Sequence, residues 1–418
     1  MSTERYAKVF AKRKATSEKR KSQTCHVYTL KIQENKLNLE QKEYLNRVFL
    51  EAKWFYNFIL SSDDIYKFNT TIKEVQVLNK EKESETRELK LLCAQSKQSI
   101  YVRTKTSIKS LSTKKKRGRK KEVGRLKFKS EVNSIPFMQN GNSWDIRNNK
   151  IKLVGCKSLF KVSGLNQLDN LELANCILFK DSTGYYIKVT TWKNIEFKNP
   201  KEVVGIDFGI KDDLVLSNGL KLKTKFPIPS SLKRCNRKLS KKVKGSKNYL
   251  KQKTKLNKSY KKLTNQKLDC KRKIVSYLKN NYCHIGIQNE NIKGWHAGLF
   301  GKQIQQSILG GIISELKQLQ QTSVIDRFFP STQLCPQCGC LNKHTLDKRV
   351  YNCDCGYTKD RDVHAAHNIL VESLNIKQIP MEHRKFTPLE FNASALLSIG
   401  KWVSMNIEGG RYNSLELC

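Results

Sequence analysis

The sequence predicts a multidomain α+β protein with a cysteine-rich metal site, and three stretches carry that prediction. Residues 125–192 contain short apolar runs separated by turn signals, which is typical of a small β-barrel or sandwich. From Val203 onward, strand-like apolar runs alternate with helical stretches, as in α/β domains. Residues 335–355 contain five cysteines in a polar segment, which favours metal binding.

The chain has 418 residues, with 80 Lys and Arg against 37 Asp and Glu and a formal net charge of +43. This length allows two or more domains. Because so large a positive charge favours a polyanionic partner, we expect the protein to bind nucleic acid. An anionic membrane is the alternative, yet the sequence has no long apolar run, secretory signal or lipidation motif. We therefore expect a soluble intracellular protein with no membrane partner.

The first half of the chain begins with a strand and continues with helices. Residues 24–33 alternate apolar and polar side chains, which predicts a strand that joins the later β-rich segment. From Asn38 the apolar residues follow a helical face, and a second helical stretch is expected over roughly 70–112. The basic, glycine-punctuated segment 114–121 is interpreted as a loop that contacts phosphates, with a solvated linker as the alternative.

The second half predicts an α/β domain around a central buried strand at 203–207. The Asn218-Gly219 dipeptide between apolar runs is typical of a hairpin turn. Between Lys233 and Lys273 there are 18 Lys or Arg and one Asp, in a helical region that is broken near Gly245. The remaining expected elements are a strand at 283–288, a helix at 302–320, a strand at 323–327, a helix at 362–374 and a poorly ordered tail at 375–418.

The cysteine cluster has the spacing of a zinc site. Cys335 and Cys338 form a two-residue knuckle, and Cys353 and Cys355 form a second, tighter pair. Thiolates paired in this way hold tetrahedral Zn²⁺, and four sulfur ligands leave no position open for a substrate. We therefore predict a structural zinc ion held by these four cysteines.

Two other residues are alternatives for one of the zinc ligands. The single residue between the last two cysteines is unusual for a zinc ribbon, so Cys340 or His344 could replace one sulfur. The other eight cysteines are scattered, and a disulfide framework is not expected in a long, lysine-rich intracellular chain.

Three acidic residues stand where metal-binding carboxylates would stand. Asp207 and Glu290 each follow a strand-like apolar run, and Asp362 begins a helical stretch. Divalent cations such as Mg²⁺ prefer oxygen ligands, and two such ions about 4 Å apart can act on a phosphodiester. Each residue has a simpler alternative, as a turn or helix-capping residue, and Asp360 is an equal candidate beside Asp362. On so basic a chain, the three together indicate a nuclease.

Five motifs in this order resemble the TnpB family of transposon-encoded RNA-guided DNA endonucleases and the related miniature type V CRISPR effectors. They are GIDFGI at 205–210, GIQNENI at 286–292, CPQCG at 335–339, CDCGYTKDRD at 353–362 and VHAAHNI at 363–369. Upstream, residues 49–57 and 124–130 are similar to the family's N-terminal helix and to the entry of its wedge barrel. The resemblance covers roughly residues 24–372. His364 departs from the pattern, since many members have Asn there.

The resemblance implies a domain arrangement. The nuclease domain would have an RNase H-like (RuvC-like) α/β fold with a four-cysteine zinc ribbon inserted before its last helix. The N-terminal part would be a small wedge-like β-barrel that carries a helical recognition insertion. The implied segments are 1–37 and 113–200 for the wedge, 38–112 for the insertion, 201–328 and 359–374 for the nuclease domain, and 329–358 for the ribbon.

The resemblance also implies an activity: Mg²⁺-dependent hydrolysis of DNA at a guide-matched target next to a short flanking motif. Asp207, Glu290 and Asp362 would be the catalytic ligands of two Mg²⁺ ions, with Asp362 preferred over Asp360 because it directly precedes the helix with paired alanines. The implied partners are a guide RNA and target double-stranded DNA, in the prokaryotic cytoplasm or nucleoid, with the protein as monomer or homodimer. Two alternatives stay open: a nuclease-inactive RNA-guided repressor, and a transposase with an acidic triad.

Basic side chains in three regions are candidates for nucleic-acid contacts. The first region is the helix after Asn38, where core packing is favoured for the neighbouring Trp54 and Tyr56. The second is the basic loop and the third is the lysine-rich helical region. The candidates are Lys53, Arg117, Arg119, Lys241, Lys242, Lys251, Lys261 and Lys262.

Overall fold

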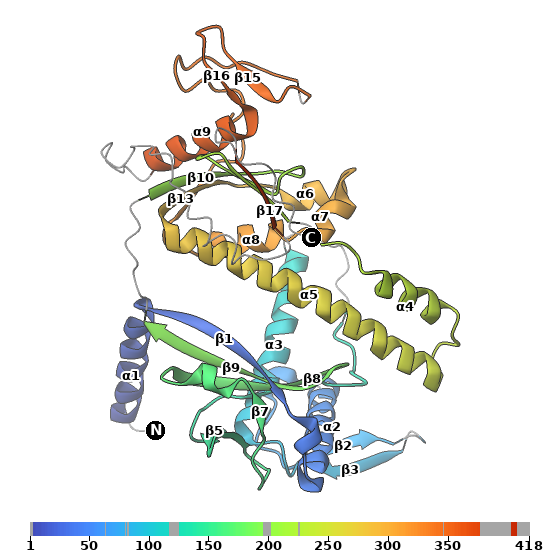
Figure 1. Cartoon of the computed structure of the whole chain (residues 1–418). Coiled ribbons are helices and arrows are strands. Elements are labelled where there is room, and N and C mark those ends of the chain that lie inside the picture. Colours follow the sequence, from blue (N-terminus) through green and yellow to red (C-terminus); the bar gives the residue numbers. More distant parts are fainter. Residues whose placement is uncertain are drawn as a thin grey trace. The chain divides into compact units, whose positions relative to one another are not determined.

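The computed structural model describes residues 3–62, 64–79, 81, 83–116, 125–194, 202–224, 226–345, 347–376 and 403–407. The chain has mixed α/β content and divides into two compact units, Met1–Glu196 and Phe197–Cys418 (Figure 1). No helix among the described residues is both long and apolar enough to span a bilayer.

The first unit contains a five-stranded antiparallel sheet, preceded by the helix α1 (Thr3–Lys21). Strand β1 lies between β9 and β7, so the predicted pairing of residues 24–33 with the later β-rich segment is confirmed. Closure of the sheet into a barrel stays a prediction. In spatial order the strands are β4 (Ser134–Phe137), β8 (Glu172–Asp181), β9 (Gly184–Asn194), β1 (Gln23–Ile32) and β7 (Val162–Ser163), with a separate hairpin of β5 (Trp144–Arg147) and β6 (Lys150–Leu153).

Two long helices, α2 (Leu39–Ser61) and α3 (Ala94–Lys116), pack beside this sheet. A capping box starts α2: the Asn38 side chain accepts a hydrogen bond from the Gln41 backbone nitrogen at 2.8 Å, and the Gln41 side chain accepts one from the Asn38 nitrogen at 2.9 Å. The apolar face expected for α2 is buried except at its first residue, Leu39, which is 72% exposed. Trp54 and Tyr56 are 7% and 8% exposed. Core packing is therefore the role of both aromatic residues.

The prediction of one helix over 70–112 is wrong for its first part. Residues 74–88 form a β-hairpin of β2 (Glu74–Leu78) and β3 (Ser84–Glu88). Val75 and Val77 alternate with polar residues, so the local pattern has the period of a strand. The Asn79 side chain accepts hydrogen bonds from the backbone nitrogens of Glu81 and Glu83, both at 2.9 Å, which stabilises the turn.

The second unit contains a six-stranded mixed sheet. Its three parallel strands are adjacent, and the Asn218-Gly219 turn joins two of its antiparallel strands, as predicted. The order is β14 (Thr322–Ile325), β13 (Tyr282–Gln288), β10 (Glu202–Phe208), β11 (Leu214–Leu216), β12 (Leu220–Thr224) and β17 (Val403–Ile407). Because β17 pairs with β12, the prediction of a poorly ordered tail is wrong for its five residues. Residues 377–402 and 408–418 lie outside the described residues.

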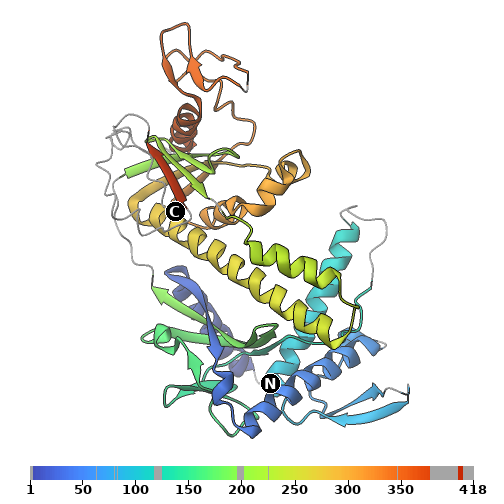
Figure 2. The same ribbon diagram turned by 45° about the vertical axis from the view of Figure 1, so that its right-hand side comes forward.

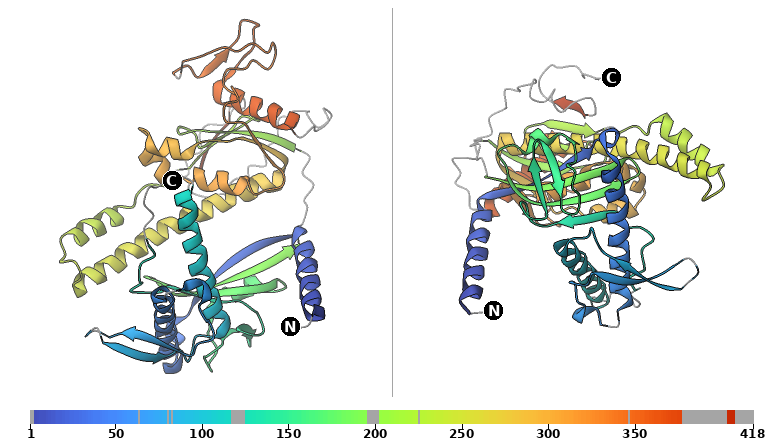
Figure 3. Two further views of the ribbon diagram at one scale, coloured as in Figure 1. Left: turned by 180° about the vertical axis from the view of Figure 1, so that it is seen from behind. Right: turned by 90° about the horizontal axis from the view of Figure 1, so that it is seen from below.

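Helices cover both faces of this sheet, with α9 (Arg361–Ile376) on one face and α5 (Lys247–Asn281) and α8 (Leu309–Leu316) on the other (Figure 1, Figure 2 and Figure 3). Helix α9 approaches the sheet closely at two glycines. A Cβ atom on Gly205 would overlap the carbonyl oxygen of Ala366 and lie 2.7 Å from the Leu370 nitrogen, and one on Gly286 would lie 3.1 Å from the Ile369 carbonyl oxygen. The absence of a side chain at Gly205 therefore admits the backbone of α9.

The remaining elements extend from this core. Helix α4 (Ser230–Ser240) forms a helical hairpin with α5, and Gly245, at φ +90°, lies in the predicted break. The single helix expected at 302–320 is divided into α7 (Gly301–Gln306) and α8. A short helix, α6 (Ile292–Ala297), precedes them. Strand β15 (Val350–Asn352) pairs with β16 (Thr358–Asp360) in the cysteine-rich ribbon.

Candidate functional site

The carboxylates of Asp207 and Glu290 lie at the same edge of the second unit's sheet. Strands β10 and β13 are parallel neighbours, with Gly205 paired to Gly286 and Ile206 to Ile287. Asp207 is the next residue of β10, and Glu290 follows β13 by two residues. Residues beyond the carboxyl ends of adjacent parallel strands meet at one edge, where α/β proteins bind their ligands.

Asp360 and Asp362, which were equal candidates on local sequence, have different partners in the structure. One oxygen of Asp360 accepts hydrogen bonds from the backbone nitrogens of Asp362 and Val363 at 3.1 and 3.0 Å, and the other lies 3.0 Å from the ammonium of Lys221. Asp360 is thus the N-terminal cap of α9. The carboxylate of Asp362 instead forms ion pairs with two guanidinium groups, those of Arg349 at 3.6 Å and Arg361 at 3.5 Å.

The three predicted carboxylates share one electrostatic environment. Burial raises the pKa of Asp207 to about 8, and the negative charges of Asp362 and Glu290 contribute to the rise in the same direction. Burial also raises the pKa of Glu290, against the opposing positive charges of Arg327 and Lys317. This accumulation of negative charge around Asp207 is relieved when a cation binds between the carboxylates.

The carboxylates are less tightly grouped than the cysteines. Within the part of the chain that the structure describes, only the cysteine cluster brings three or more ligand atoms within 4.8 Å of one another. A site for two ions about 4 Å apart, however, does not need such tight grouping, because each carboxylate can contact a different ion. The all-oxygen donor set of Asp207, Glu290 and Asp362 fits Mg²⁺ or Mn²⁺ better than a soft metal.

The sulfur atoms of Cys335, Cys338, Cys353 and Cys355 form a compact set. All lie within 4.8 Å of one another, with separations of 3.6 Å between Cys335 and Cys355 and 3.5 Å between Cys338 and Cys353. A tetrahedral zinc ion with Zn–S bonds of about 2.3 Å places its sulfurs about 3.8 Å apart, so the donors fit Zn²⁺. Burial tends to raise the pKa of the Cys335 thiol, but backbone hydrogen bonds from Cys338 and Gln337 lower it to about 6, which favours a thiolate ligand.

The two alternative zinc ligands have other roles. The carbonyl of Cys340 accepts a hydrogen bond from the Cys335 backbone nitrogen at 2.9 Å, closing the first knuckle, while its side chain is exposed. The ring of His344 packs edge-on to Tyr351 with centroids 4.9 Å apart. Neither residue is part of the four-sulfur group.

The ribbon is joined to α9 by residues that the sequence did not single out for this purpose. The Tyr351 ring stacks on the buried His364 ring, with centroids 3.8 Å apart and an interplanar angle of 16°. The amide of Asn368 donates to the carbonyls of Ser331 and Leu334 at 2.8 and 2.7 Å. His364 and Asn368 lie on the helix that begins beside Asp362, so the ribbon and the carboxylate site share one element.

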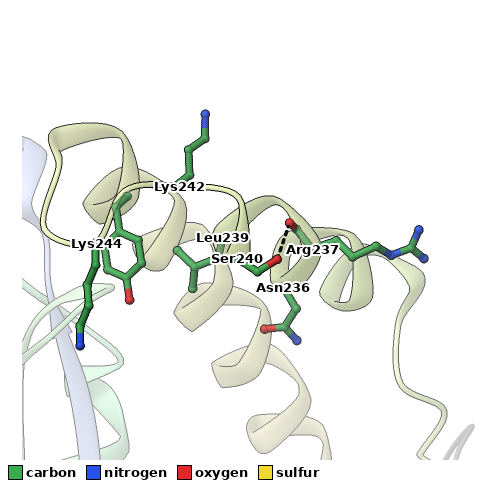
Figure 4. Close-up of a pocket in the computed structure, with 7 residues that line it drawn as sticks. Asn236, Arg237, Leu239, Ser240, Lys242 and Lys244 are labelled. Carbon is green, nitrogen blue, oxygen red and sulfur yellow. Dashed lines mark hydrogen bonds between the residues drawn. The ribbon is translucent and has the colours of Figure 1, made fainter.

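The basic candidates are distributed over both units. Lys241, Lys242, Lys251 and Lys262 are exposed on the α4–α5 hairpin, and Lys261 is half-buried. Lys53 is half-buried on α2, and Arg117 and Arg119 lie outside the described residues. The turn of the hairpin contains a pocket of about 650 Å³ (Figure 4). It is lined by Asn236, Arg237, Leu239, Ser240, Lys242, Lys244 and Tyr249.

Comparisons with known proteins match two segments of the chain. Residues 186–296 match the OrfB_IS605 model, described as a probable transposase, and residues 317–369 match the Cas12f1-like TNB domain. A Streptomyces pristinaespiralis protein named "Putative RNA-guided DNA endonuclease" is 32% identical over 184 residues, which cover 41% of this chain and 45% of that relative. The match therefore spans less than half of the relative's length.

A solved structure is also similar over most of the chain. The cryo-EM structure of a Cas12f1–sgRNA–target DNA complex covers 83% of this chain and 99% of its own, at 15% identity and a TM-score of 0.25, which is too low for a comparison of geometry. The two matched segments contain all seven predicted metal ligands, the three carboxylates and the four cysteines. The resemblance to the TnpB family and to Cas12f1-like proteins is thus confirmed over residues 186–296 and 317–369.

Proposed function

We propose that this protein is an RNA-guided DNA endonuclease whose catalytic ligands are Asp207, Glu290 and Asp362. The observation that carries the proposal is the convergence of these carboxylates from β10, β13 and α9, with a shared effect on the pKa of Asp207. The segments that contain them match the transposase and TNB-domain models. We assign this part of the chain an RNase H-like (RuvC-like) fold, with segments 201–328 and 359–374.

Each of the surrounding residues has a defined part in this proposal. Bound Mg²⁺ ions would supply an activated water and stabilise the leaving 3′-oxygen of the phosphodiester. Asp360 caps α9 and so orients the first turn that carries Asp362. The positive charges of Arg327 and Lys317 oppose the rise that burial causes in the pKa of Glu290, and so favour the carboxylate form that would bind a metal. The four-cysteine cluster would hold a structural Zn²⁺ in the ribbon that packs on α9.

The proposed partners are a guide RNA and the target DNA. The relative from Streptomyces is named as an RNA-guided endonuclease, and the chain's net charge of +43 suits two polyanionic partners. In such proteins base pairing with the guide reads most of the target sequence, while basic side chains hold the backbone of the heteroduplex. We assign those contacts to the exposed lysines of the α4–α5 hairpin. We propose that the protein acts in the prokaryotic cytoplasm or nucleoid.

The direct test uses the RNA that co-purifies with the protein. That RNA is sequenced, and a DNA library with the matching target and a randomised flank is incubated with the complex and Mg²⁺. We expect cleavage by the wild type and none by Asp207→Ala. The assignment fails if both proteins cut equally, or if neither cuts any member of the library.

A transposase is the second candidate, because the OrfB_IS605 model carries that description. The same carboxylates would then act on transposon ends and join strands. Products in which one DNA is covalently joined to another would favour this candidate. Guide-dependent binding without any cleavage would favour the nuclease-inactive repressor.

A further inference from the structure

Phe328 is a large aromatic side chain that projects into solvent beside the carboxylate site, with 83% exposure. Strands β13 and β14 are parallel neighbours, and Gln288 pairs with Ile325 at their ends. Glu290 lies two residues beyond Gln288, and Phe328 lies three residues beyond Ile325. Because adjacent strands lie about 4.8 Å apart, the two segments leave the same edge of the sheet side by side.

The turn that presents Phe328 is held by hydrogen bonds to the buried Gln288 side chain and by one from its own backbone. The side-chain amide nitrogen of Gln288, a residue that is 6% exposed, lies within hydrogen-bond distance of three carbonyl oxygens of this turn, which share its two N–H groups. The distances are 3.2 Å to Asp326, 3.1 Å to Arg327 and 2.9 Å to Phe329. The Asp326 carboxylate accepts a hydrogen bond from the Phe328 backbone nitrogen at 2.7 Å. A single exposed Phe is common on protein surfaces, but this one is fixed in place by the strand that leads to Glu290.

We propose that Phe328, together with Arg327, forms a stacking site for an unpaired base of the DNA strand that enters the carboxylate site. This inference rests on the proposed nuclease function for the identity of the strand. The Arg327 guanidinium lies 5.5 Å from the centre of the Phe328 ring, so one position offers an aromatic face and a cation for the phosphate. Base–aromatic stacking is tolerant of sequence and requires a base whose face is not covered by a duplex neighbour. Single-stranded DNA is therefore the ligand class.

The test measures stacking without cleavage. The RNA-loaded protein carries Asp207→Asn so that DNA survives, and short single-stranded DNA with a central 2-aminopurine is titrated in. We expect the fluorescence of 2-aminopurine to be quenched when the DNA binds. The quenching should persist with Phe328→Trp, which keeps an aromatic face. Phe328→Leu keeps the apolar bulk without the ring, and should lose the quench and weaken binding about tenfold.

Controls separate stacking from folding and from general binding. Since Phe328 is exposed, Phe328→Leu should leave the thermal unfolding temperature unchanged. Phe128→Leu removes an aromatic ring with 64% exposure from the first unit and should leave the quench intact. An equal quench and affinity for Phe328→Leu and the parent overturns the inference, and so does quenching by RNA but not by DNA. Failure of the nuclease proposal appears separately, as absence of cleavage by the wild-type complex.

Discussion

The cysteine cluster and the carboxylate trio are both candidate metal sites of the second unit, but they are assembled differently. The four sulfurs come from two short turns and lie within 4.8 Å of one another. The carboxylates come from β10, from the segment after β13 and from α9, and are coupled mainly through charge and burial. Local spacing is enough to build the first site, whereas the second depends on strand register and on the packing of α9.

The largest expected effect is on the carboxylate side of this comparison. Glu290→Gln keeps the size of the side chain but removes a charged ligand, so cleavage of target DNA should fall by at least about 10²-fold. Zinc content, measured by atomic absorption, should not change. Glu315→Gln is the matched control, because this glutamate of α8 pairs with Lys271 of α5, away from the carboxylate trio. A Glu290→Gln complex that cuts at nearly the wild-type rate would show that the trio is not the metal site.

The next effect concerns the cysteine side. Cys335→Ser should remove zinc and leave the ribbon open to proteolysis, because structural zinc contributes roughly 10–16 kcal/mol to the folding of small zinc domains. Cys340→Ser, outside the four-sulfur group, should retain zinc and resist proteolysis like the wild type. Zinc content and limited proteolysis measure both outcomes. Loss of zinc from Cys340→Ser would instead support the alternative ligand set.

A third test addresses the helix packing that the carboxylate site needs. Gly205→Ala places a methyl group against the backbone of α9, which should reduce the free energy of unfolding by about 3 kcal/mol and lower cleavage by displacing Asp362. Gly310→Ala, in helix α8, is the control, because a Cβ atom there would meet only Cγ2 of Ile292, at 3.6 Å. That variant should unfold at or slightly above the wild-type temperature. Equal melting temperatures for the two variants would refute the packing argument.

The smallest effect is a pH-dependent stability change at Asp207. Its pKa is about 8 in the folded protein against an ordinary value of 3.8, so the folded state binds the proton more tightly. The contribution of Asp207 to stability in Mg²⁺-free buffer should therefore be greatest below pH 4 and decline as the pH rises toward 8. Asp207→Asn removes that decline, so its melting temperature should exceed the wild type's by several degrees at pH 8 and equal it near pH 4. A constant difference across this range would contradict the shift.

Much of the second unit could be predicted from the sequence because its signals are local. The apolar runs at β10 and β13, the Asn218-Gly219 turn and the cysteine pairs each lie within a few residues. The hairpin at 74–88 was missed because the strand-like alternation of Val75 and Val77 is short and lies in a lysine- and glutamate-rich segment. Strand β17 was missed because its pairing with β12 is a long-range contact with weak local periodicity.

The surroundings of the carboxylates could not be predicted. Arg349 reaches Asp362 from the ribbon, and Arg327 acts on Glu290 from the turn after β14. These contacts depend on how distant segments pack, and a charged residue in a loop has no pattern that identifies its partner. The division of roles between Asp360 and Asp362 likewise required the geometry of the first turn of α9.

The most direct test of the carboxylate site compares Asp362→Asn with Asp360→Asn. Asparagine caps helices as well as aspartate does, so Asp360→Asn should preserve α9, and the lost contact with Lys221 should affect stability more than cleavage. We predict that RNA-loaded Asp360→Asn cuts target DNA within about threefold of the wild type in Mg²⁺, while Asp362→Asn is slower by at least about 10²-fold at equal zinc content. Equal rates for the two variants, or a greater loss for Asp360→Asn in a folded protein, would contradict the assignment of Asp362.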